Sequence, residues 1–155
     1  MFYSNYRHNV DTKGRVFIPA RWRSDLSDTV IITIDESGRD QGGFLQCMAL
    51  EEWERYVKTF SMIQRTNDEA MGILRVMMAN TFDCEMDKQG RILIPQYLRD
   101  YAGITGEVLM NGIFDRVEIW DPEAWEAYRG DVSKNRRERL DALNKAMKPQ
   151  TEAVK

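Results

Sequence analysis

The chain has 155 residues, 43% of them hydrophobic and 30% charged, and a formal net charge of −3, which are values typical of a globular protein. No apolar run approaches the roughly 18 residues that a membrane-spanning helix needs, and the first residues lack the features of a signal peptide, so we expect a cytoplasmic protein with no membrane partner. A single histidine, His8, and two distant cysteines, Cys47 and Cys84, offer neither metal-ligand spacing nor a nucleophile–base pair, so we expect no metal, no cofactor and free thiols in or near a core.

The first third of the sequence predicts strands together with one short helix. In chain order the expected elements are a turn at 11–14, a strand over 15–18, a helix over 20–26, and strands near 29–34 and 44–48. The strands are expected where β-branched and aromatic residues cluster. Pro19 ends the first of them because it has no backbone N–H to donate, and it suits the first turn of the helix.

Two longer helices are expected between residues 50 and 80. Leu50 opens the first and the second lies near 68–80, with a hinge at 61–68 between them. Their apolar residues recur at the spacing of one helical face, and comprise Trp53, Tyr56, Val57 and Phe60 in the first helix and Met71, Leu74, Met77 and Met78 in the second. Such stripes are typical of a core or of a subunit contact rather than of a cofactor site.

The last part of the sequence repeats the order of the first. Its expected elements are a turn at 87–90, a strand over 91–94, a helix over 96–102, strands near 107–111 and 114–120, a helix opened by Asp121-Pro122 and a last helix over 133–148. Gly103 is a natural end for the short helix, since glycine adopts a left-handed conformation at low cost. The last helix carries Leu140, Leu143 and Met147 on one side, and we expect residues 149–155 to be frayed.

This similar order reflects an internal duplication. Residues 11–19, Asp-Thr-Lys-Gly-Arg-Val-Phe-Ile-Pro, recur 76 residues later as 87–95, Asp-Lys-Gln-Gly-Arg-Ile-Leu-Ile-Pro, and an arginine, Arg23 or Arg99, follows each proline after four residues. Two copies are too few for a solenoid. Each covers roughly 45 residues, near the size below which one core cannot stand alone. We therefore expect the copies to interleave around one core with pseudo-twofold symmetry.

The duplicated motif combines a tight turn with an arginine at the start of a strand. Aspartate accepts hydrogen bonds from backbone amides just ahead of it and glycine takes positive φ cheaply, so the turn-bracing residues are expected to be Asp11, Gly14, Asp87 and Gly90. A rigid turn presents its arginine with little entropy to lose. Guanidinium pairs with guanine or phosphate in bidentate fashion, and a two-stranded ribbon can enter the major groove.

This reading makes Arg15 and Arg91 candidates for base recognition. Lys13 and Lys88 stand beside them and are candidates for phosphate contacts, which add affinity without sequence information. Arg7 belongs to the same basic segment, because residues 1–24 carry five basic side chains against one acid. Residues 25–56 carry eight acids against two basic side chains. Such segregation permits a positive face on an acidic protein, although an ordinarily mixed surface would also satisfy these charges.

Three other interpretations of basic groups stay open. Each Asp–Arg pair could serve purely to brace its turn, or could brace the turn and orient the arginine at once. His8 could touch phosphate, but a plain strand residue is the simpler reading. The run Lys134-Asn135-Arg136-Arg137-Glu138-Arg139 could be a second phosphate-binding element or merely a solvated helix face.

The paired Asp-x-x-x-Arg motifs, each continuing into Ile-Pro and a later arginine, resemble the MraZ family of the AbrB-like, swapped-hairpin group. The resemblance runs from about Tyr6 to Tyr128. It implies an α+β fold of two AbrB-like (double-split β-α-β) halves related by pseudo-twofold symmetry, with additional helices. The corresponding parts are a first repeat at 5–52, connecting helices at 53–80, a second repeat at 81–124 and a helical tail at 125–155.

The resemblance also implies a function. Members of this family are nucleoid-associated transcriptional regulators that bind short direct repeats in double-stranded DNA, upstream of the division and cell-wall gene cluster that begins with their own gene. They form ring-like homo-oligomers whose subunits contribute basic residues to a common face. The family's motif residues Asp11, Arg15, Asp87 and Arg91 are present here, whereas Gln89 stands where the first copy has Lys13. That departure puts an equal role for both halves in doubt.

Two alternatives belong to other classes of protein. An enzyme could use Asp11 and Asp87 as a carboxylate pair, but an arginine four residues on should lower the pKa of each acid, whereas a general acid needs a raised one. We therefore expect no catalytic residue and no small-molecule substrate. A protein-interaction module of the antitoxin type is also compatible with an AbrB-like fold, and residues 129–148 are its candidate partner-binding segment.

Overall fold

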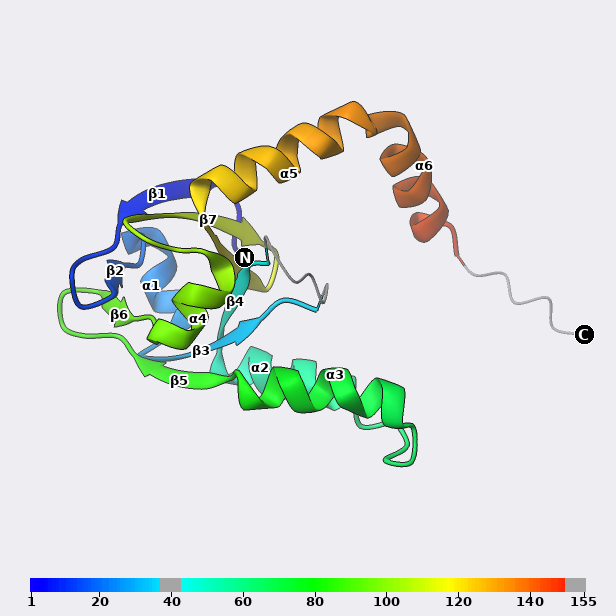
Figure 1. Cartoon of the computed structure of the whole chain (residues 1–155), viewed down its shortest axis with the longest axis horizontal. Coiled ribbons are helices and arrows are strands. Elements are labelled where there is room, and N and C mark those ends of the chain that lie inside the picture. The colour runs from blue at the N-terminus through cyan, green and yellow to red at the C-terminus, as the bar shows by residue number, and fades with distance from the viewer. Residues whose placement is uncertain (37–42, 150–155) are drawn as a thin grey trace, which may run out of the picture. The chain divides into compact units, whose positions relative to one another are not determined.

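The main sheet of the protein is antiparallel and draws on both sequence copies. The computed structural model describes residues 1–36 and 43–149, so most of the segment expected to be frayed lies outside the described residues. Across the sheet in this part of the chain lie β1 (Asn5–Asn9), β7 (Glu107–Ile113), β8 (Arg116–Trp120), β4 (Leu45–Ala49), β3 (Thr29–Ile34) and β5 (Phe82–Glu85) (Figure 1). Every neighbouring pair runs antiparallel.

This strand order reads the same from either edge when the two copies are exchanged. β1 of the first copy pairs with β7 of the second, and β5 of the second copy pairs with β3 of the first. β4 and β8 meet at the centre. The predicted α+β fold with two interleaved, pseudo-symmetric halves is therefore confirmed.

A second, smaller sheet joins the two copies of the duplicated motif. β2 (Arg15–Phe17) pairs antiparallel with β6 (Arg91–Leu93), and Val16 lies opposite Ile92. The pairing extends beyond both strands, since the N–H of Ile18 donates to the Gly90 carbonyl at 2.8 Å and the N–H of Ile94 donates to the Gly14 carbonyl at 3.0 Å. We call this two-stranded unit the ribbon.

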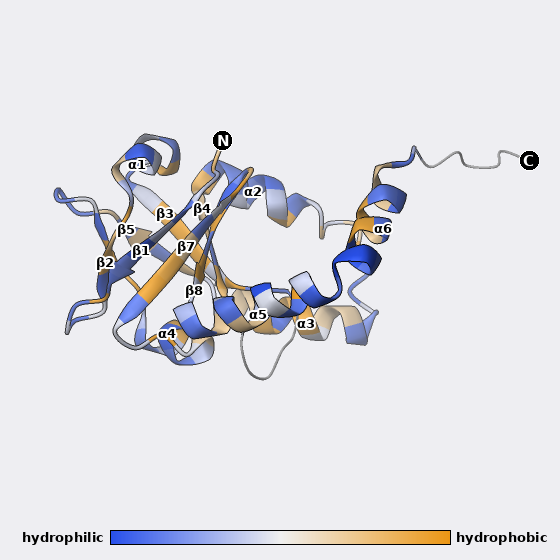
Figure 2. Ribbon diagram, turned by 90° about the horizontal axis from the view of Figure 1, so that it is seen from above, coloured by the Kyte–Doolittle hydropathy of each residue, from blue (hydrophilic) through white to orange (hydrophobic). Residues whose placement is uncertain are grey.

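One hydrophobic core lies between the ribbon and the main sheet and takes residues from both copies. In the ribbon, Val16 and Ile92 are buried in this core, as are Ile18 and Ile94 just beyond the strands. The hydropathy colouring of Figure 2 shows apolar residues along the sheet strands. Burying an aliphatic side chain of this size contributes about 1.5–3 kcal/mol. Because the buried side chains come from both copies, neither copy has a core of its own to fold around.

Two short helices follow the ribbon strands at the predicted positions. α1 (Ala20–Leu26) and α4 (Gln96–Ala102) begin directly after Pro19 and Pro95, which occupy the N-cap positions in extended conformations. The prolines thus stand one residue before the first helical turn, where their missing N–H costs nothing. α4 ends at Gly103, which has the expected left-handed conformation with φ +66°.

The buried faces of α1 and α4 close the core. Trp22 and Leu26 are buried on α1, and Leu98 and Ala102 on α4. The Trp22 indole meets the ring of Tyr6 edge to face at 5.0 Å between centroids, a geometry that aromatic quadrupoles favour.

Helices α2 (Leu50–Lys58) and α3 (Asp68–Ala79) connect the two copies. Tyr56 of α2 packs against the core, and its hydroxyl lies 4.0 Å from the sulfur of the buried Met77 of α3. In the predicted α3 stripe Met77 is buried, whereas Met78 is exposed. Residues 61–66, within the expected hinge, form turns, and the Asn67 side chain caps α3 by accepting from the N–H of Ala70.

Several predicted boundaries differ from the structure: the strand expected near 107–111 extends to Ile113, and α2 ends at Lys58, before Phe60 of the predicted stripe. The strand expected over 114–120 begins at Arg116, because Phe114 adopts φ +58° in the tight turn between β7 and β8. The last helix, expected over 133–148, is α6 (Arg136–Met147), and residues 133–134 instead end α5 (Pro122–Lys134). Asn135 separates the two helices, since its side-chain amide donates to the carbonyl oxygen of Asp131 at 3.1 Å.

The chain divides into two compact units, Met1–Pro122 and Glu123–Lys155. The first contains both sheets and the core. The second is helical in its described part, where the Arg139 guanidinium lies over the Tyr128 ring at 5.7 Å and pairs with Asp131 at 3.1 Å. None of the described helices is both long and apolar enough to cross a membrane.

The acid-anchored turns form as the motif predicts, and the same geometry occurs in both copies. Asp11 Oδ1 accepts the backbone N–H groups of Lys13 and Arg15, each at 2.9 Å. In the second copy Asp87 Oδ1 accepts the N–H groups of Gln89 and Arg91 at the same distance. Each aspartate therefore satisfies two amides that the turn would otherwise leave unpaired.

Each turn glycine is also a contact point for the other copy. Gly14 and Gly90 have φ of +90° and +86°. A Cβ on Gly14 would lie 2.6 Å from the guanidinium carbon of Arg99, and a Cβ on Gly90 would collide with the guanidinium of Arg23. The glycines are therefore needed for conformation and for space.

The hydrogen bonds in these turns lower the pKa of both aspartates. The pKa of Asp11 is lowered to about 2, first because the Arg15 backbone N–H donates to its carboxylate and then because the Arg15 side chain does so. The pKa of Asp87 is lowered for the same reasons, with the backbone N–H of Arg91 as the largest cause. The predicted direction is correct, although the arginine charge on which that prediction was based is not the largest cause.

We expect Gly90→Ala to destabilise the protein by about 1–3 kcal/mol, because alanine must hold positive φ and its Cβ meets the Arg23 side chain. Urea denaturation of the variant and the parent measures the difference. Gly72→Ala is the matched control, since Gly72 lies in α3 with no atom within 4 Å of an added Cβ, and alanine should raise the stability there by about 0.5–1 kcal/mol. Equal effects at both positions would contradict the turn geometry.

We expect the stability difference between the parent and Asp11→Asn to depend on pH. Because the pKa of folded Asp11 lies below the ordinary 3.8, its carboxylate stabilises the fold above about pH 4, and this contribution disappears as the pH falls toward 2. Asparagine resembles the protonated acid, so urea midpoints of the two proteins should differ at pH 7 and converge only as the pH falls to about 2 and below. A difference that is constant with pH would show that the charge is not involved.

Candidate nucleic-acid interface

Arg15 and Arg91 are each tied to their turn by a single nitrogen. Arg15 Nε donates to Asp11 Oδ2 at 2.7 Å, and Arg91 Nε donates to Asp87 Oδ2 at 2.8 Å. Within the described residues, no hydrogen bond engages the Nη atoms of either guanidinium. The carboxylate thus orients each side chain while the two outer nitrogens keep their hydrogen atoms for another acceptor.

Both arginines lie on the outer face of the ribbon. Because side chains alternate along a strand, the buried Val16 and Ile92 leave Arg15 and Arg91 on the opposite face, where their side chains are 33% and 23% exposed. Arg15 thus lies on the outer face, as predicted, but its side chain is partly buried because its Nε is bonded to Asp11 in the turn.

Two large apolar side chains share this outer face. Phe17 and Leu93 are 43% and 50% exposed. In the strand register Phe17 stands opposite Arg91, and Leu93 stands opposite Arg15. The Arg91 guanidinium carbon lies 5.9 Å from the centroid of the Phe17 ring. The sequence had indicated these two residues only as parts of strands, although their spacing of two from each arginine already placed them on one face.

The two turns reach the same end of the unit that contains the sheets. In Figures 1 and 2 the loop that precedes β2 and the loop that precedes β6 project on the side that carries the ribbon. Because β2 and β6 are antiparallel, the two turns lie at opposite ends of the ribbon. Lys13 and Lys88 are exposed on these loops. The ribbon therefore places Arg15 and Arg91 on adjacent strands, with Lys13 and Lys88 on the turns at its two ends.

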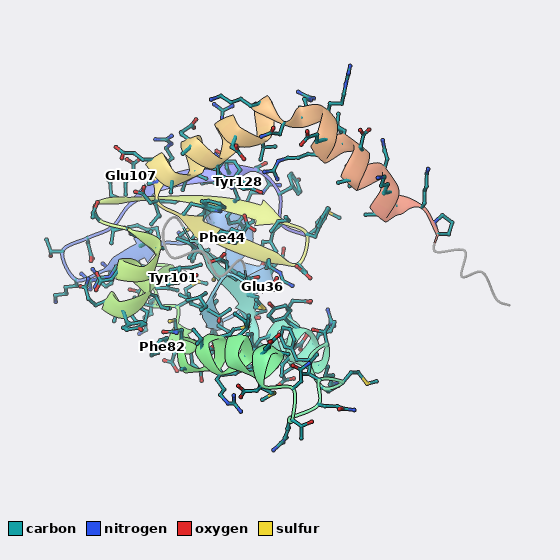
Figure 3. The ribbon with its side chains drawn as sticks, turned by 45° about the vertical axis from the view of Figure 1, so that its right-hand side comes forward. Glu36, Phe44, Phe82, Tyr101, Glu107 and Tyr128 are labelled. Carbon is teal, nitrogen blue, oxygen red and sulfur yellow. The ribbon has the colours of Figure 1, made fainter. Side chains whose placement is uncertain are left out.

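Arg7 occupies a different place. It lies exposed on β1, at the edge of the main sheet, where its Nη1 is 3.9 Å from Glu107 Oε1. Glu107 stands at the start of β7 and is labelled in Figure 3. Arg7 therefore lies outside the ribbon, and the nearby carboxylate offsets part of its charge.

His8 and the cysteines agree with their simpler interpretations. His8 is a residue of β1, its Nε2 is buried without a hydrogen-bond partner in the described part of the chain, and burial lowers its pKa, with the Arg23 charge as a smaller cause. Cys47 and Cys84 are free and buried. Burial raises the pKa of both thiols, that of Cys84 to about 11.

Arg23 and Arg99 have a role that the sequence did not reveal. Arg23 Nε donates to the Ile18 carbonyl at 2.8 Å, and Arg99 Nε donates to the Ile94 carbonyl at 3.0 Å. From there each guanidinium reaches the turn glycine of the other copy. Their repetition four residues after each proline was the available signal, but it did not indicate a contact between copies.

Comparison with known proteins places this geometry in a family. The model of the "MraZ protein" family, whose description also carries the words "antitoxin-like", matches the chain twice, at residues 1–76 and 77–145. The two matches correspond to the two copies of the acid-anchored turn.

Several relatives are similar over most of their length. A protein of Acetivibrio thermocellus is 42% identical over 84% of this chain and 88% of its own. One of Thermoanaerobacter pseudethanolicus is 41% identical over 93% of this chain and 99% of its own, and one of Carboxydothermus hydrogenoformans is 41% identical over 83% and 86%. Each is named transcriptional regulator MraZ, which is not an enzyme name and agrees with the expectation that the chain is not an enzyme. On these matches the chain belongs to the MraZ family.

Proposed function

We propose that the chain is a sequence-specific DNA-binding transcriptional regulator that reads double-stranded DNA with the outer face of the ribbon. The observation that carries the proposal is the repeated arrangement of Arg15 and Arg91. Each is held by its Nε to a turn aspartate, and its Nη atoms are free of hydrogen bonds within the described residues. Two such groups lie on one face of a ribbon built from both copies.

The chemistry of this arrangement suits base recognition. A guanidinium pairs with the O6 and N7 atoms of guanine through two N–H groups, and one good pair of this kind provides about 1–3 kcal/mol of discrimination between bases. Because the aspartate already fixes the arginine, little side-chain entropy remains to be lost on binding. A two-stranded ribbon also has dimensions that the major groove accommodates.

The remaining basic residues would strengthen binding without reading sequence. Lys13 and Lys88 are exposed on the turns, and Arg7 is exposed on β1, so each could meet a phosphate. A single subunit with a net charge of −3 offers few such contacts. A ring-like homo-oligomer on tandem sites would add them, because linked sites bind at a high effective concentration.

Membership of the family supports a proposal for the DNA target and the location. The names of the relatives support a role in transcription. By the same resemblance we propose that the sites are short direct repeats upstream of the division and cell-wall gene cluster, including the chain's own promoter, and that the protein works in the cytoplasm at the nucleoid. We further propose the functional division into repeats at 5–52 and 81–124, connecting helices at 53–80 and a tail at 125–155.

A second candidate is a protein-interaction module of the antitoxin type. The family description favours it, and so does the exposed stripe of Leu140, Leu143 and Met147 on α6, since contiguous apolar surface is typical of partner binding. A mobility-shift assay with the gene's upstream fragment and a scrambled fragment separates the two. An interaction module would retard neither fragment preferentially.

We expect Arg15→Ala to abolish preference for the upstream fragment, with a loss of roughly 1–3 kcal/mol for each arginine–guanine pair in the complex, while the oligomer persists. Fluorescence anisotropy with specific and scrambled DNA measures the preference, and light scattering measures the mass. Arg75→Ala is the matched control, because Arg75 is also an arginine paired with an aspartate, but lies on α3. If Arg15→Ala unfolds or dissociates, Arg15 is a bracing residue instead.

We also expect the affinity for the upstream fragment to fall steeply with salt. Three phosphate contacts from one subunit would give a log–log slope of about −3, since each released counterion contributes about −0.9. Several subunits on one fragment should therefore give a slope steeper than about −5. Titrations between 50 and 300 mM potassium chloride supply the measurement, and a slope of −3 or shallower would rule out a footprint shared between subunits.

A further inference from the structure

We propose that Phe17 and Leu93 read thymine by contacting its 5-methyl group in the major groove, beside the bases that Arg15 and Arg91 recognise. This inference rests on the proposed function of the ribbon. It assigns sequence information to two side chains without charge or hydrogen-bonding groups. Apolar contact with the thymine methyl is an established form of base recognition.

The first support is that the core does not require these side chains. The inner face of the ribbon is complete with Val16 and Ile92, both fully buried. Phe17 and Leu93 point to the other side and keep about half of their surface exposed. Folding leaves about half of the surface of each of these side chains uncovered, and this apolar surface is available to a partner.

The second support is the charge around them, which limits what that partner can be. The arginine opposite each apolar residue has Nη atoms that no described residue binds, and Lys13 and Lys88 are exposed on the flanking turns. An apolar protein surface placed here would bury two guanidinium groups without new acceptors, which is costly. The major groove offers phosphates, guanine acceptors and methyl groups within one surface.

The third support is spacing. Opposite residues on paired strands have Cβ atoms about 5 Å apart, and residues two apart on one strand are about 7 Å apart. Base pairs follow one another at about 3.4 Å along each strand of DNA. A methyl group read by Phe17 or Leu93 should therefore lie within about two base pairs of a guanine read by an arginine.

The two apolar contacts are not equivalent. The Arg91 guanidinium lies over the aromatic ring of Phe17, whereas Arg15 stands opposite the aliphatic Leu93. An aromatic ring and an isobutyl group present different shapes to a methyl group. We therefore infer that the two halves of the ribbon prefer thymine to different degrees.

The test replaces thymidine by deoxyuridine, one position at a time on both strands of the upstream fragment, and measures affinity by fluorescence anisotropy. This change removes the methyl group and keeps all hydrogen-bonding groups of the base. We expect affinity to fall about fourfold at one or two positions close to an arginine-dependent guanine, which is the effect of about 0.8 kcal/mol for one buried carbon group. The other positions should be unaffected.

Variants then assign each position to a side chain. Phe17→Ala and Leu93→Ala should each lower affinity for the thymidine fragment and become insensitive to deoxyuridine at one position. Phe17→Leu keeps an apolar contact and is the conservative variant to use if Phe17→Ala does not fold. Its affinity should still fall when deoxyuridine replaces thymidine at that position. Ile73→Ala is the matched control, because Ile73 is similarly exposed on α3, and its deoxyuridine profile should equal that of the parent.

Other outcomes overturn the inference in distinguishable ways. If the parent binds the upstream fragment but no deoxyuridine position changes affinity, the thymine contact does not exist although the proposed function stands. If the parent shows no preference for that fragment, the proposed function itself fails. If Phe17→Ala or Leu93→Ala changes the mass of the oligomer in light scattering, the apolar pair is covered by a second copy of the chain.

Discussion

The antiparallel pairing of β2 with β6 is the constraint on which the rest of the structure depends. It places the two motif strands side by side, buries Val16 and Ile92 in one core and links each strand to the other turn through the carbonyls of Gly14 and Gly90. Without this pairing, each copy would expose its apolar strand. The residues that we propose to contact DNA inherit their positions from it, because two arginines far apart in the chain share a face only when these strands meet.

The sequence left open whether each Asp–Arg pair only braces its turn or also orients the arginine, and the geometry of the turn permits both. Bracing and recognition need not compete, since Asp11 uses one oxygen for two backbone amides and the other for the Nε of Arg15. The Nη atoms lie beyond this contact. A lysine at position 15 would offer one nitrogen for both tasks and would have to give up one of them.

Much of this architecture could be predicted because its signals are local. Pro19 marked the start of α1, Gly103 marked the end of α4, and the duplication indicated that the copies interleave. Features that depend on contacts between distant segments could not be predicted. A strand pattern shows which side chains share a face but not which strand lies opposite, so the contact of Arg23 with the other turn stayed hidden. The turn at Phe114 was missed because a phenylalanine rarely adopts positive φ.

The pseudo-twofold pairing of β2 with β6 has a consequence for the proposed binding of DNA. A rotation by half a turn exchanges the two strands of the ribbon but does not match their side chains, because Lys13 corresponds to Gln89 and Phe17 corresponds to Leu93. A fully symmetric ribbon would bind equally well in either orientation and would favour palindromes. This ribbon has two different ends, so in the proposed oligomer subunits that point the same way along DNA would need sites that also point the same way.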